Sequence, residues 1–249
     1  MHTVYIGTAG WSLSSAVASR FPLDGSQLQR YAQVLDCVEI NSSFYRSHQS
    51  ATYARWAAST PEHFRFSVKL PRSITHERRL RDGAAELDRF AGEVMQLGNK
   101  LGCVLVQLPP SLRFEADVAA AFFQALRQRF GGMLACEARH PNWFAAQATG
   151  LLTAQRITRV RADPPAGQPG PHVPTTSEAY LRLHGSPKIY YSDYPADYLA
   201  ALAAELHAQT QADNWCIFDN TAAGAALFNA LDLQARLRDA PAAPAHRAI

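Results

Sequence analysis

The chain has 249 residues, of which 47% are hydrophobic and 18% are charged, the composition of a soluble globular protein with a sizeable core. Its formal net charge of +3 permits an anionic ligand but falls well short of the charge of a typical nucleic-acid-binding domain. No apolar run is long enough to span a bilayer, and a strand pattern begins where a signal peptide would lie, so we expect a cytoplasmic protein without membrane association.

Short strand patterns alternate with helical patterns along the chain. Strands are expected at residues 3–8, 37–41, 65–70, 103–108, 134–139, 158–163, 180–184 and 215–219. Helices are expected at residues 26–35, 51–59, 84–100, 118–130, 143–155, 196–209 and 222–237. Eight such units in about 240 residues predict an α/β fold, a (β/α)8 TIM-like barrel whose helix after the sixth strand is irregular or missing. No linker divides the chain, so we expect a single domain over residues 1–238 and a flexible tail over 239–249.

Most of these strands end in two polar side chains spaced two residues apart. The pairs are Glu39 with Asn41, Ser67 with Lys69, Glu137 with Arg139, Arg161 with Asp163, and Arg182 with His184. Residues two apart on a strand face the same side of a sheet, and the strands of a barrel end at one mouth, where active sites lie. We therefore expect a shared polar site made of Glu39, Asn41, Lys69, Gln107, Glu137, Arg139, Asp163, His184 and Asp219, with Arg161 and Arg182 one layer deeper.

Within this site, Glu137 beside the Arg139 guanidinium stays ionised, which suits a base or an anchor. Arg139 and Lys69 would stabilise developing negative charge, and His76 or His184 would be the proton-transfer partner. Lys69 could also form a Schiff base with a substrate. The structural alternative is an ion network, in which Lys69 only neutralises nearby carboxylates.

Aromatic and basic residues after the strands support a second interpretation. The aromatic residues are Trp11, Phe44, Tyr45, Trp143, Tyr190, Tyr191 and Tyr194, and the loop after the third strand carries Arg72, Arg78, Arg79 and Arg81. Aromatic rings beside arginines are typical of single-stranded nucleic-acid binding, which is the alternative function. The structural interpretation is that the rings cap the core and the loop is a solvated charged turn.

A divalent metal ion is the third interpretation, in which the carboxylates and His184 bind the metal of a hydrolase or isomerase. Each candidate ligand has a basic competitor nearby, and no compact motif such as HExxH occurs. The four cysteines lie too far apart in the sequence for a metal knuckle or a redox pair and are expected to be small buried thiols. We therefore expect no metal and no other cofactor, with a divalent ion as the alternative.

Segments along nearly the whole chain resemble the successive motifs of the YecE-like family, a domain of unknown function. The segments are IGTAGWS, VEINSSFYR, FSVKLPRSITHERRL, LVQLPPSLRF, CEARHPNWF, YLRLHGSPKIYYSDY and CIFDNTAAGAALFNALDL. The resemblance implies a TIM-barrel-like fold and no particular activity. The motif residues fall here on Gly7, Trp11, Glu39, Asn41, Tyr45, Thr75, His76, Gln107, Glu137, Arg139, Trp143, Arg182, His184, Gly185 and Asn220. The family usually has Phe-Asn-Asn where this chain has Phe218, Asp219 and Asn220, and the added negative charge argues against a purely anionic ligand at this strand.

Together these observations predict an enzyme that acts on a small anionic substrate, phosphorylated or carboxylated, by acid–base chemistry of the lyase, isomerase or hydrolase kind. The candidate catalytic residues are Glu137, Lys69, His184 and His76. The candidate substrate-binding residues are Arg139, Glu39, Asn41, Gln107, Arg182, Trp11, Tyr45, Trp143, Asp219 and Asn220.

Overall fold

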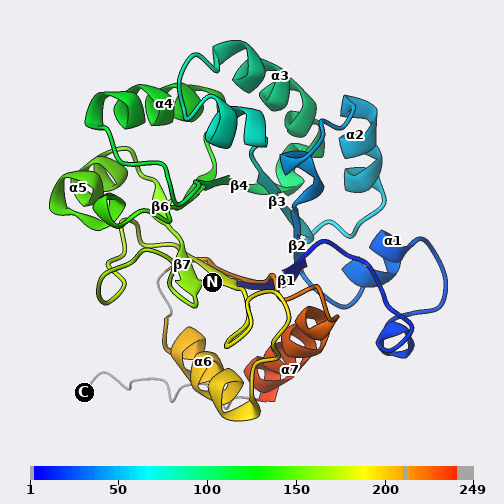
Figure 1. Cartoon of the computed structure of the whole chain (residues 1–249). Coiled ribbons are helices and arrows are strands. Elements are labelled where there is room, and N and C mark those ends of the chain that lie inside the picture. The colour runs from blue at the N-terminus through cyan, green and yellow to red at the C-terminus, as the bar shows by residue number, and fades with distance from the viewer. Residues whose placement is uncertain (1–2, 210–211, 240–249) are drawn as a thin grey trace, which may run out of the picture.

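A ring of parallel strands forms the centre of the computed structural model, which describes residues 3–209 and 212–239 (Figure 1). The strands are β1 Val4–Ala9, β2 Cys37–Ile40, β3 Arg65–Lys69, β4 Leu101–Gln107, β5 Met133–Glu137, β6 Thr158–Arg159, β7 Arg161–Asp163, β8 Ala179–Leu183 and β9 Asn214–Phe218. They form one nine-stranded sheet in the order β6-β5-β4-β3-β2-β1-β9-β8-β7.

The two edge strands of this sheet are the two halves of the predicted sixth strand. β6 pairs with β5, and β7 pairs with β8. Only Val160 separates them, and its N–H still donates to the carbonyl of Cys136 at 2.9 Å. The chain itself therefore joins the two edges, and the eight predicted strands form the expected TIM-like barrel, nearly closed at this point.

Helices surround the barrel on its outer side (Figure 1). They are α1 Gln27–Ala32, α2 Ser50–Ala58, α3 Ala84–Val94, α4 Ala116–Arg129, α5 Ala146–Ala154, α6 Ala196–Ala208 and α7 Ala225–Asp239. Residues 164–178, which connect β7 to β8, contain no helix, so the missing helix after the sixth strand is confirmed. Among the described residues, none of these helices is long and apolar enough to cross a membrane.

Most predicted boundaries differ from the structure by one to three residues, and two of the differences concern the long helix and the tail. The helix expected over residues 84–100 ends as an α-helix at Val94, and a 3-10 segment, Met95–Lys100, follows it. Gly98 in that segment has φ +58°, a left-handed conformation that interrupts a helix and that glycine adopts at little cost. Asp239 still belongs to α7, and residues 240–249 of the expected tail lie outside the described residues.

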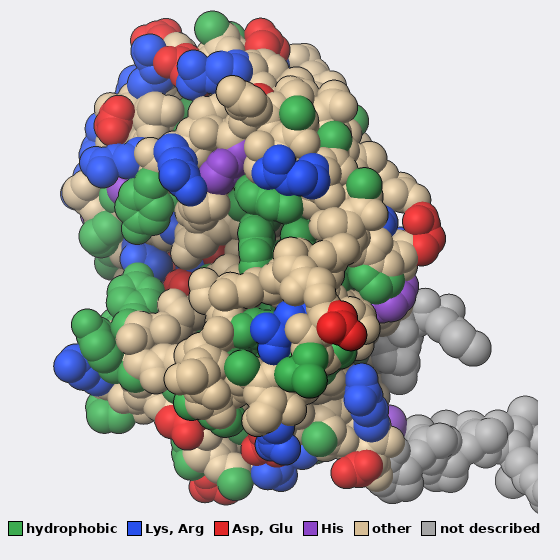
Figure 2. Space-filling model, turned by 90° about the vertical axis from the view of Figure 1, so that its right-hand side faces the viewer, with side chains coloured by type: hydrophobic (Ala, Val, Ile, Leu, Met, Phe, Trp, Pro, Cys, Tyr) green, Lys and Arg blue, Asp and Glu red, His purple; other side chains and the backbone are tan. Residues whose placement is uncertain are grey.

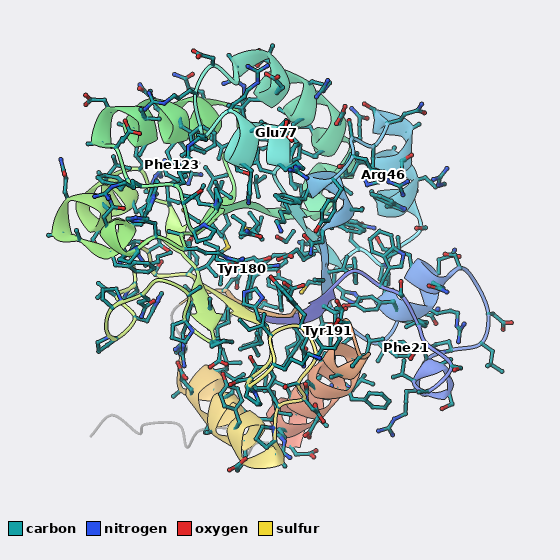
Figure 3. All side chains as sticks on the ribbon, in the orientation of Figure 1. Phe21, Arg46, Glu77, Phe123, Tyr180 and Tyr191 are labelled. Atoms are coloured by element: carbon teal, nitrogen blue, oxygen red, sulfur yellow. The ribbon has the colours of Figure 1, made fainter. Side chains whose placement is uncertain are left out.

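Apolar side chains fill both sides of the sheet. The larger core lies between the strands and the helices, where Phe123 of α4 packs (Figure 3). A smaller cluster fills the lower part of the barrel, where the Trp215 ring lies 4.9 Å from the ring of Tyr5 and stacks on Tyr180 at 5.9 Å. The four cysteines are buried free thiols, as expected. This apolar cluster fills the half of the barrel interior nearer the N-terminal ends of the strands. The polar inward-facing residues therefore lie nearer the C-terminal ends.

Gly7 of β1 is a position at which the barrel has no room for a side chain. A Cβ atom built there would lie 2.1 Å from the carbonyl oxygen of its strand neighbour Cys37. We expect Gly7→Ala to lower the free energy of unfolding by about 3 kcal/mol or more, because β1 and β2 must separate. Gly92→Ala in α3, where nothing lies within 4 Å, is the control and should raise it by about 0.5–1 kcal/mol. Urea unfolding measures both, and equal effects would contradict the packing argument.

Candidate functional site

Arg182, in β8, lies at the centre of the barrel with no exposed surface. Its Nε and Nη2 donate to the two carboxylate oxygens of Glu39 at 3.0 and 2.7 Å. Its Nη1 donates to Glu137 Oε2 at 2.5 Å, and Nη2 also donates to Asp219 Oδ2 at 2.9 Å. One guanidinium therefore joins three carboxylates that come from β2, β5 and the residue after β9, by charge-assisted hydrogen bonds.

Two further side chains complete the hydrogen bonding of these carboxylates. Arg139 donates from Nε to Glu137 Oε1 at 2.8 Å, and its Nη2 lies 2.7 Å from the same oxygen. The hydroxyl of Tyr180 lies 2.9 Å from Glu39 Oε2 and 2.7 Å from Ser67 Oγ, at the centre of the ring of strands (Figure 3). Burial alone would raise the pKa of Glu137, but the charges of Arg182, His184 and Arg139 outweigh it and hold the pKa well below its ordinary value. Glu137 is thus an anchor for two arginines, and this geometry favours the anchor over the base.

His184 follows β8 and continues the inward face that carries Tyr180 and Arg182. Its Nδ1 lies 3.0 Å from Asp219 Oδ2. Its Nε2 lies 3.4 Å from Glu137 Oε1 without hydrogen-bond geometry, so Nε2 is a buried atom that lacks a partner among the described residues. Burial alone would lower the pKa of His184, but Asp219 and Glu137 outweigh it and raise the pKa above the ordinary value. The imidazole is therefore held by Asp219 at Nδ1, while Nε2 makes no hydrogen bond and has only the 3.4 Å contact with Glu137, an arrangement that suits an oriented acid or base.

Lys69 ends β3 on the inner face and is 5% exposed. Within residues 3–209 and 212–239 its ammonium group makes neither a hydrogen bond nor an ion pair, and Nζ lies 4.1 Å from the centre of the Phe44 ring. Burial and the charge of Arg182 lower the pKa of Lys69 to about 8, against the opposing effect of Glu39, Glu137 and Asp219. Lys69 forms no direct ion pair with a described carboxylate, because these are bound to Arg182, but Glu39 and Glu137 lie near enough to act on its charge, and the structural alternative in which Lys69 neutralises them stays a prediction.

The imidazole of His76 packs against the Phe44 ring, which the Lys69 ammonium also contacts. His76 belongs to a π-helical turn, Ser73–Glu77, that follows β3, and its ring packs edge-on against Phe44 with centroids 4.9 Å apart. Its Nδ1 lies 2.8 Å from Thr75 Oγ1. Burial and the neighbouring Lys69, Arg72 and Arg139 charges lower the pKa of His76 to about 4, so the imidazole is neutral at pH 7.

Three residues near the network were not among the predicted site residues. Tyr180 could have been found by extending the inward face of β8 two residues back from Arg182. Phe44 was noted only as one of several aromatic residues, and nothing in the sequence connects it with Lys69. Tyr190 has φ +71°, its N–H donates to the carbonyl of His184, and its ring packs edge-on against the His184 ring.

Other predicted residues differ in how they relate to the network. Asn41, just after β2, and Gln107, the last residue of β4, continue the inward-facing rows of these strands. The side-chain oxygen of Asn41 is buried without a partner among the described residues. Four residues do not contact the network: Trp11, Tyr45, Trp143 and Asn220. Trp11 packs against Trp56 and Tyr45 is 72% exposed. The Trp143 indole is 1% exposed and donates to the Leu112 carbonyl, so a ligand cannot reach it. Asn220 is fully buried and donates to Ser192 and Asn229, which ties two loops together.

Arg161 and Asp163 correct the expectation that every polar pair faces the mouth. Arg161 forms an ion pair with Glu205 of α6. Asp163 accepts hydrogen bonds from Tyr194 and Tyr198 at 2.9 and 3.0 Å. Both therefore face outward, on the side where the helix after β7 is missing, because Val160 and not its neighbours occupies the inner face.

The arginine-rich loop after β3 is neutralised by its own surroundings. Arg72 pairs with Glu77 at 3.1 Å, and Arg78 and Arg81 pair with Glu86 and Glu115, each at 2.6 Å. Arg79 donates to the Ser111 carbonyl at 2.8 Å. On the upper part of the face in Figure 2, basic and acidic side chains are likewise intermixed. Three of the four arginines thus pair with acidic side chains, as in the structural interpretation, and nucleic-acid binding stays the alternative prediction.

The donor set of the network does not suit a divalent metal ion. Arg182 lies between the carboxylates of Glu39, Glu137 and Asp219, where a cation would have to bind. In the described part of the chain, no group of three or more His, Cys, Asp or Glu side chains is placed to hold a metal. The Arg182 guanidinium thus occupies the place between the carboxylates where a divalent ion would bind.

Two cavities lie beside the network and not within it. A cavity of about 660 Å³ is lined by the end of β1, the loop after it and residues 221–227. These segments follow β1 and β9, so the cavity opens at the C-terminal end of the barrel. The other, of about 520 Å³, lies between residues 172–178 and α6 and is lined by Arg161 and Glu205, so it belongs to the outer face of the barrel.

Comparison with known proteins places this barrel in a family. Residues 5–248 match the family described as "Protein of unknown function DUF72". The chain belongs to the DUF72 family. The UPF0759 protein YecE of Escherichia coli K12 is 30% identical over 143 residues, which are 57% of this chain and 50% of that protein. The chain thus aligns with about half the length of YecE.

Two further DUF72 comparisons cover more of the chain. The UPF0759 protein YunF of Bacillus subtilis strain 168 is 28% identical over 203 residues, 74% of this chain and 71% of that protein. The crystal structure of a DUF72 family protein of Thermotoga maritima has a TM-score of 0.80 and 27% identity, and the match covers 96% of this chain and 100% of that one. The family resemblance and the barrel fold expected from the sequence are both confirmed, and DUF72 by its description carries no assigned activity.

Removing Arg182 should leave three buried carboxylates without their common partner. We expect Arg182→Met to lower the free energy of unfolding at pH 7 by about 3–5 kcal/mol, because uncompensated buried charge is costly. The difference should shrink as the pH falls, because Arg182 lowers the pKa of Glu137 and of Asp219 in the folded wild type, and the stability gained from this is lost as these carboxylates are protonated. Urea unfolding of Arg182→Met and of Arg113→Met, an exposed arginine, measures the difference. Similar values for the two variants would show that Arg182 does not hold the network together.

Removing Lys69 should have the opposite effect. The pKa of Lys69 is about 8 in the folded protein against 10.5 for an ordinary lysine, so below pH 8 the folded state bears the cost of a desolvated ammonium. We expect Lys69→Met to raise the free energy of unfolding at pH 7 by about 1–3 kcal/mol. The gain should decline between pH 8 and pH 10.5, where the folded amine is neutral and the unfolded one is not.

The matched control for this prediction is the other buried lysine. Lys100 Nζ donates to the carbonyls of Ala57 and Thr60 at 2.7 and 2.6 Å. Lys100→Met should therefore lower stability by about 1–3 kcal/mol, since it leaves buried carbonyl groups unsatisfied. If Lys69→Met also loses stability in urea unfolding, Lys69 is a structural residue.

Proposed function

We propose that this protein is an enzyme that binds a small anionic substrate, carboxylated or phosphorylated, at the C-terminal mouth of the barrel and acts on it by acid–base chemistry. One observation carries the proposal. The Lys69 ammonium forms no hydrogen bond or ion pair with the described residues, because the three nearby carboxylates are bound to Arg182. His184 Nε2 forms no hydrogen bond with them either, and its one charged contact is Glu137 Oε1 at 3.4 Å. Polar groups buried without a partner cost free energy, and a ligand would supply the missing partner.

The charge of the mouth supports an anion. Lys69, Arg139, Arg182 and a protonated His184 carry four positive charges against the three of the carboxylates. The additional negative charge of Asp219, which argued against an anionic ligand in the sequence, is shared between Arg182 and His184. Arg139 is 18% exposed at its side chain, more than the other charged groups of the network, and is the proposed contact for the substrate's anionic group.

His184 is the proposed proton-transfer residue. Asp219 holds its Nδ1, which orients the ring and leaves Nε2 towards the substrate. Asp219 and Glu137 raise the pKa of His184 and so favour its protonated form, from which the residue can donate a proton and afterwards accept one. Glu137 keeps Arg139 and Arg182 in place and is not the base. The cytoplasmic location and the single domain expected from the sequence remain predictions.

Binding of two simple anions tests the proposal. We expect glycerol 3-phosphate or lactate to raise the melting temperature of the protein and glycerol not to, because only the anions meet the positive charges of the mouth. In titration calorimetry, Arg139→Gln should weaken the binding about tenfold, the cost of one charge-assisted contact. Arg113→Gln, at an exposed site, is the control and should bind normally. The affinity should also fall as the pH rises through about 8, where Lys69 loses its proton. Equal binding by the wild type and Arg139→Gln would refute the assignment of the mouth as the site.

A further inference from the structure

The chain has only three lysines, and the structure uses them in three different ways. Lys188 lies in the loop after β8, where Nζ is 4.0 Å from the centre of the Tyr191 ring. Lys100 is buried and its Nζ bonds to two backbone carbonyls. Lys69 is buried, ends a barrel strand at the mouth and has no polar partner among the described residues. A buried lysine that forms no bond in the protein is placed for chemistry with a ligand.

We propose that Lys69 forms an imine with the substrate, and that the substrate is therefore a small oxo compound, a ketone or aldehyde that also carries a carboxylate or a phosphate. This inference rests on the proposed function of the mouth and adds the class of its substrate. The geometry that supports it is the position of Lys69 on the inner face of β3, between the apolar ring of Phe44 and the cationic Arg182 network.

This environment keeps the Lys69 amine nucleophilic. A lysine that is desolvated beside another cation is the usual imine-forming lysine, because the uncharged amine attacks carbonyl groups. Arg182 lies close enough to oppose the ammonium, and its own bonds keep Glu39, Glu137 and Asp219 from pairing with it. With a pKa of about 8, roughly a quarter of Lys69 is the free amine at pH 7.5, whereas an ordinary lysine has about a thousandth.

The chemistry needs one proton-transfer group, and His184 supplies it. The Lys69 nitrogen attacks the carbonyl carbon, the π electrons move to the oxygen, and the oxygen takes a proton from His184 Nε2. The new ammonium nitrogen returns a proton to His184, which leaves a neutral carbinolamine. His184 then protonates the hydroxyl, the C–O bond breaks, water leaves, and the nitrogen lone pair forms the C=N bond of a cationic imine. The carboxylates near Lys69 stabilise the positive charge of the imine. Arg139 binds the substrate's anionic group.

Reductive trapping tests the imine directly. The wild-type protein is incubated at pH 7.5 with sodium cyanoborohydride and either pyruvate or dihydroxyacetone phosphate, and with acetone as the ketone without an anionic group. Hydride addition to the imine carbon leaves a stable secondary amine that peptide mass spectrometry locates. We expect at least about tenfold more label on Lys69 than on the exposed Lys188, as an activated amine requires, and little label with acetone. Lys69→Arg keeps the charge and should lose the label.

The outcomes separate the two proposals. Labelling of Lys69 and Lys188 to the same extent, or no label on Lys69 with either probe, overturns the imine. If glycerol 3-phosphate and lactate, which lack a carbonyl group, still bind through Arg139 in that case, the anion site stands and only the imine fails. If these anions also fail to bind, the proposed function fails with it. Mapping of the wild-type protein decides the result even where the Lys69→Arg variant does not fold, and circular dichroism shows whether it does.

Discussion

The charge of Arg182 sets the arrangement of everything around it. A guanidinium with no exposed surface can exist only if nearly all its donors are hydrogen-bonded to compensating charge, because isolated burial of a charge is very costly. Three carboxylates meet this requirement, and each must end its strand at the right height to reach Arg182. The apolar cluster below, with Trp215 stacked on Tyr180, closes the barrel beneath them and confines the charges to the upper half.

Because Arg182 takes the carboxylates, the remaining polar groups of the mouth are left without partners. Lys69 lies beside negative charge that it cannot pair with directly, and His184 is bonded at Nδ1 but not at Nε2. A protein selected for stability alone would gain from apolar residues at such positions, since buried unpaired groups lower stability. The network thus explains why Lys69 and His184 Nε2 lack hydrogen-bond partners at its edge, and under the proposed function a ligand would supply them.

The place where the barrel lacks a helix has a separate structural role. Between β7 and β8 a loop takes the place that a helix has in the other units of the barrel. Arg161 and Asp163 face outward there and contact Glu205, Tyr194 and Tyr198 of the following segment. The Tyr194 hydroxyl also accepts a hydrogen bond from the Gly185 N–H. This bond links the outward pair to the loop after β8, in which Tyr190 packs against the His184 ring. The outward polar pair therefore supports the loop over the mouth and takes no part in the charged network.

The sequence by itself determined the barrel and the composition of the site. Alternating strand and helix patterns predicted the eight strands and the missing helix, because the periods of two and of about 3.6 residues are local properties of the chain. That Glu39, Lys69, Glu137, Arg182 and His184 each share one face of a strand with a polar neighbour also followed from spacing along single strands.

Only the tertiary structure decided which side each pair faces and which groups remain free. A spacing of two places Arg161 and Asp163 on one side but cannot say which, and they face outward. The partners of Arg182 lie 143, 45 and 37 residues away in the sequence, so nothing local reveals that it binds all three carboxylates. Trp143 likewise looked like a binding residue until burial placed it in the core. Pairing and burial depend on contacts between distant segments, and those exist only once the sheet has closed.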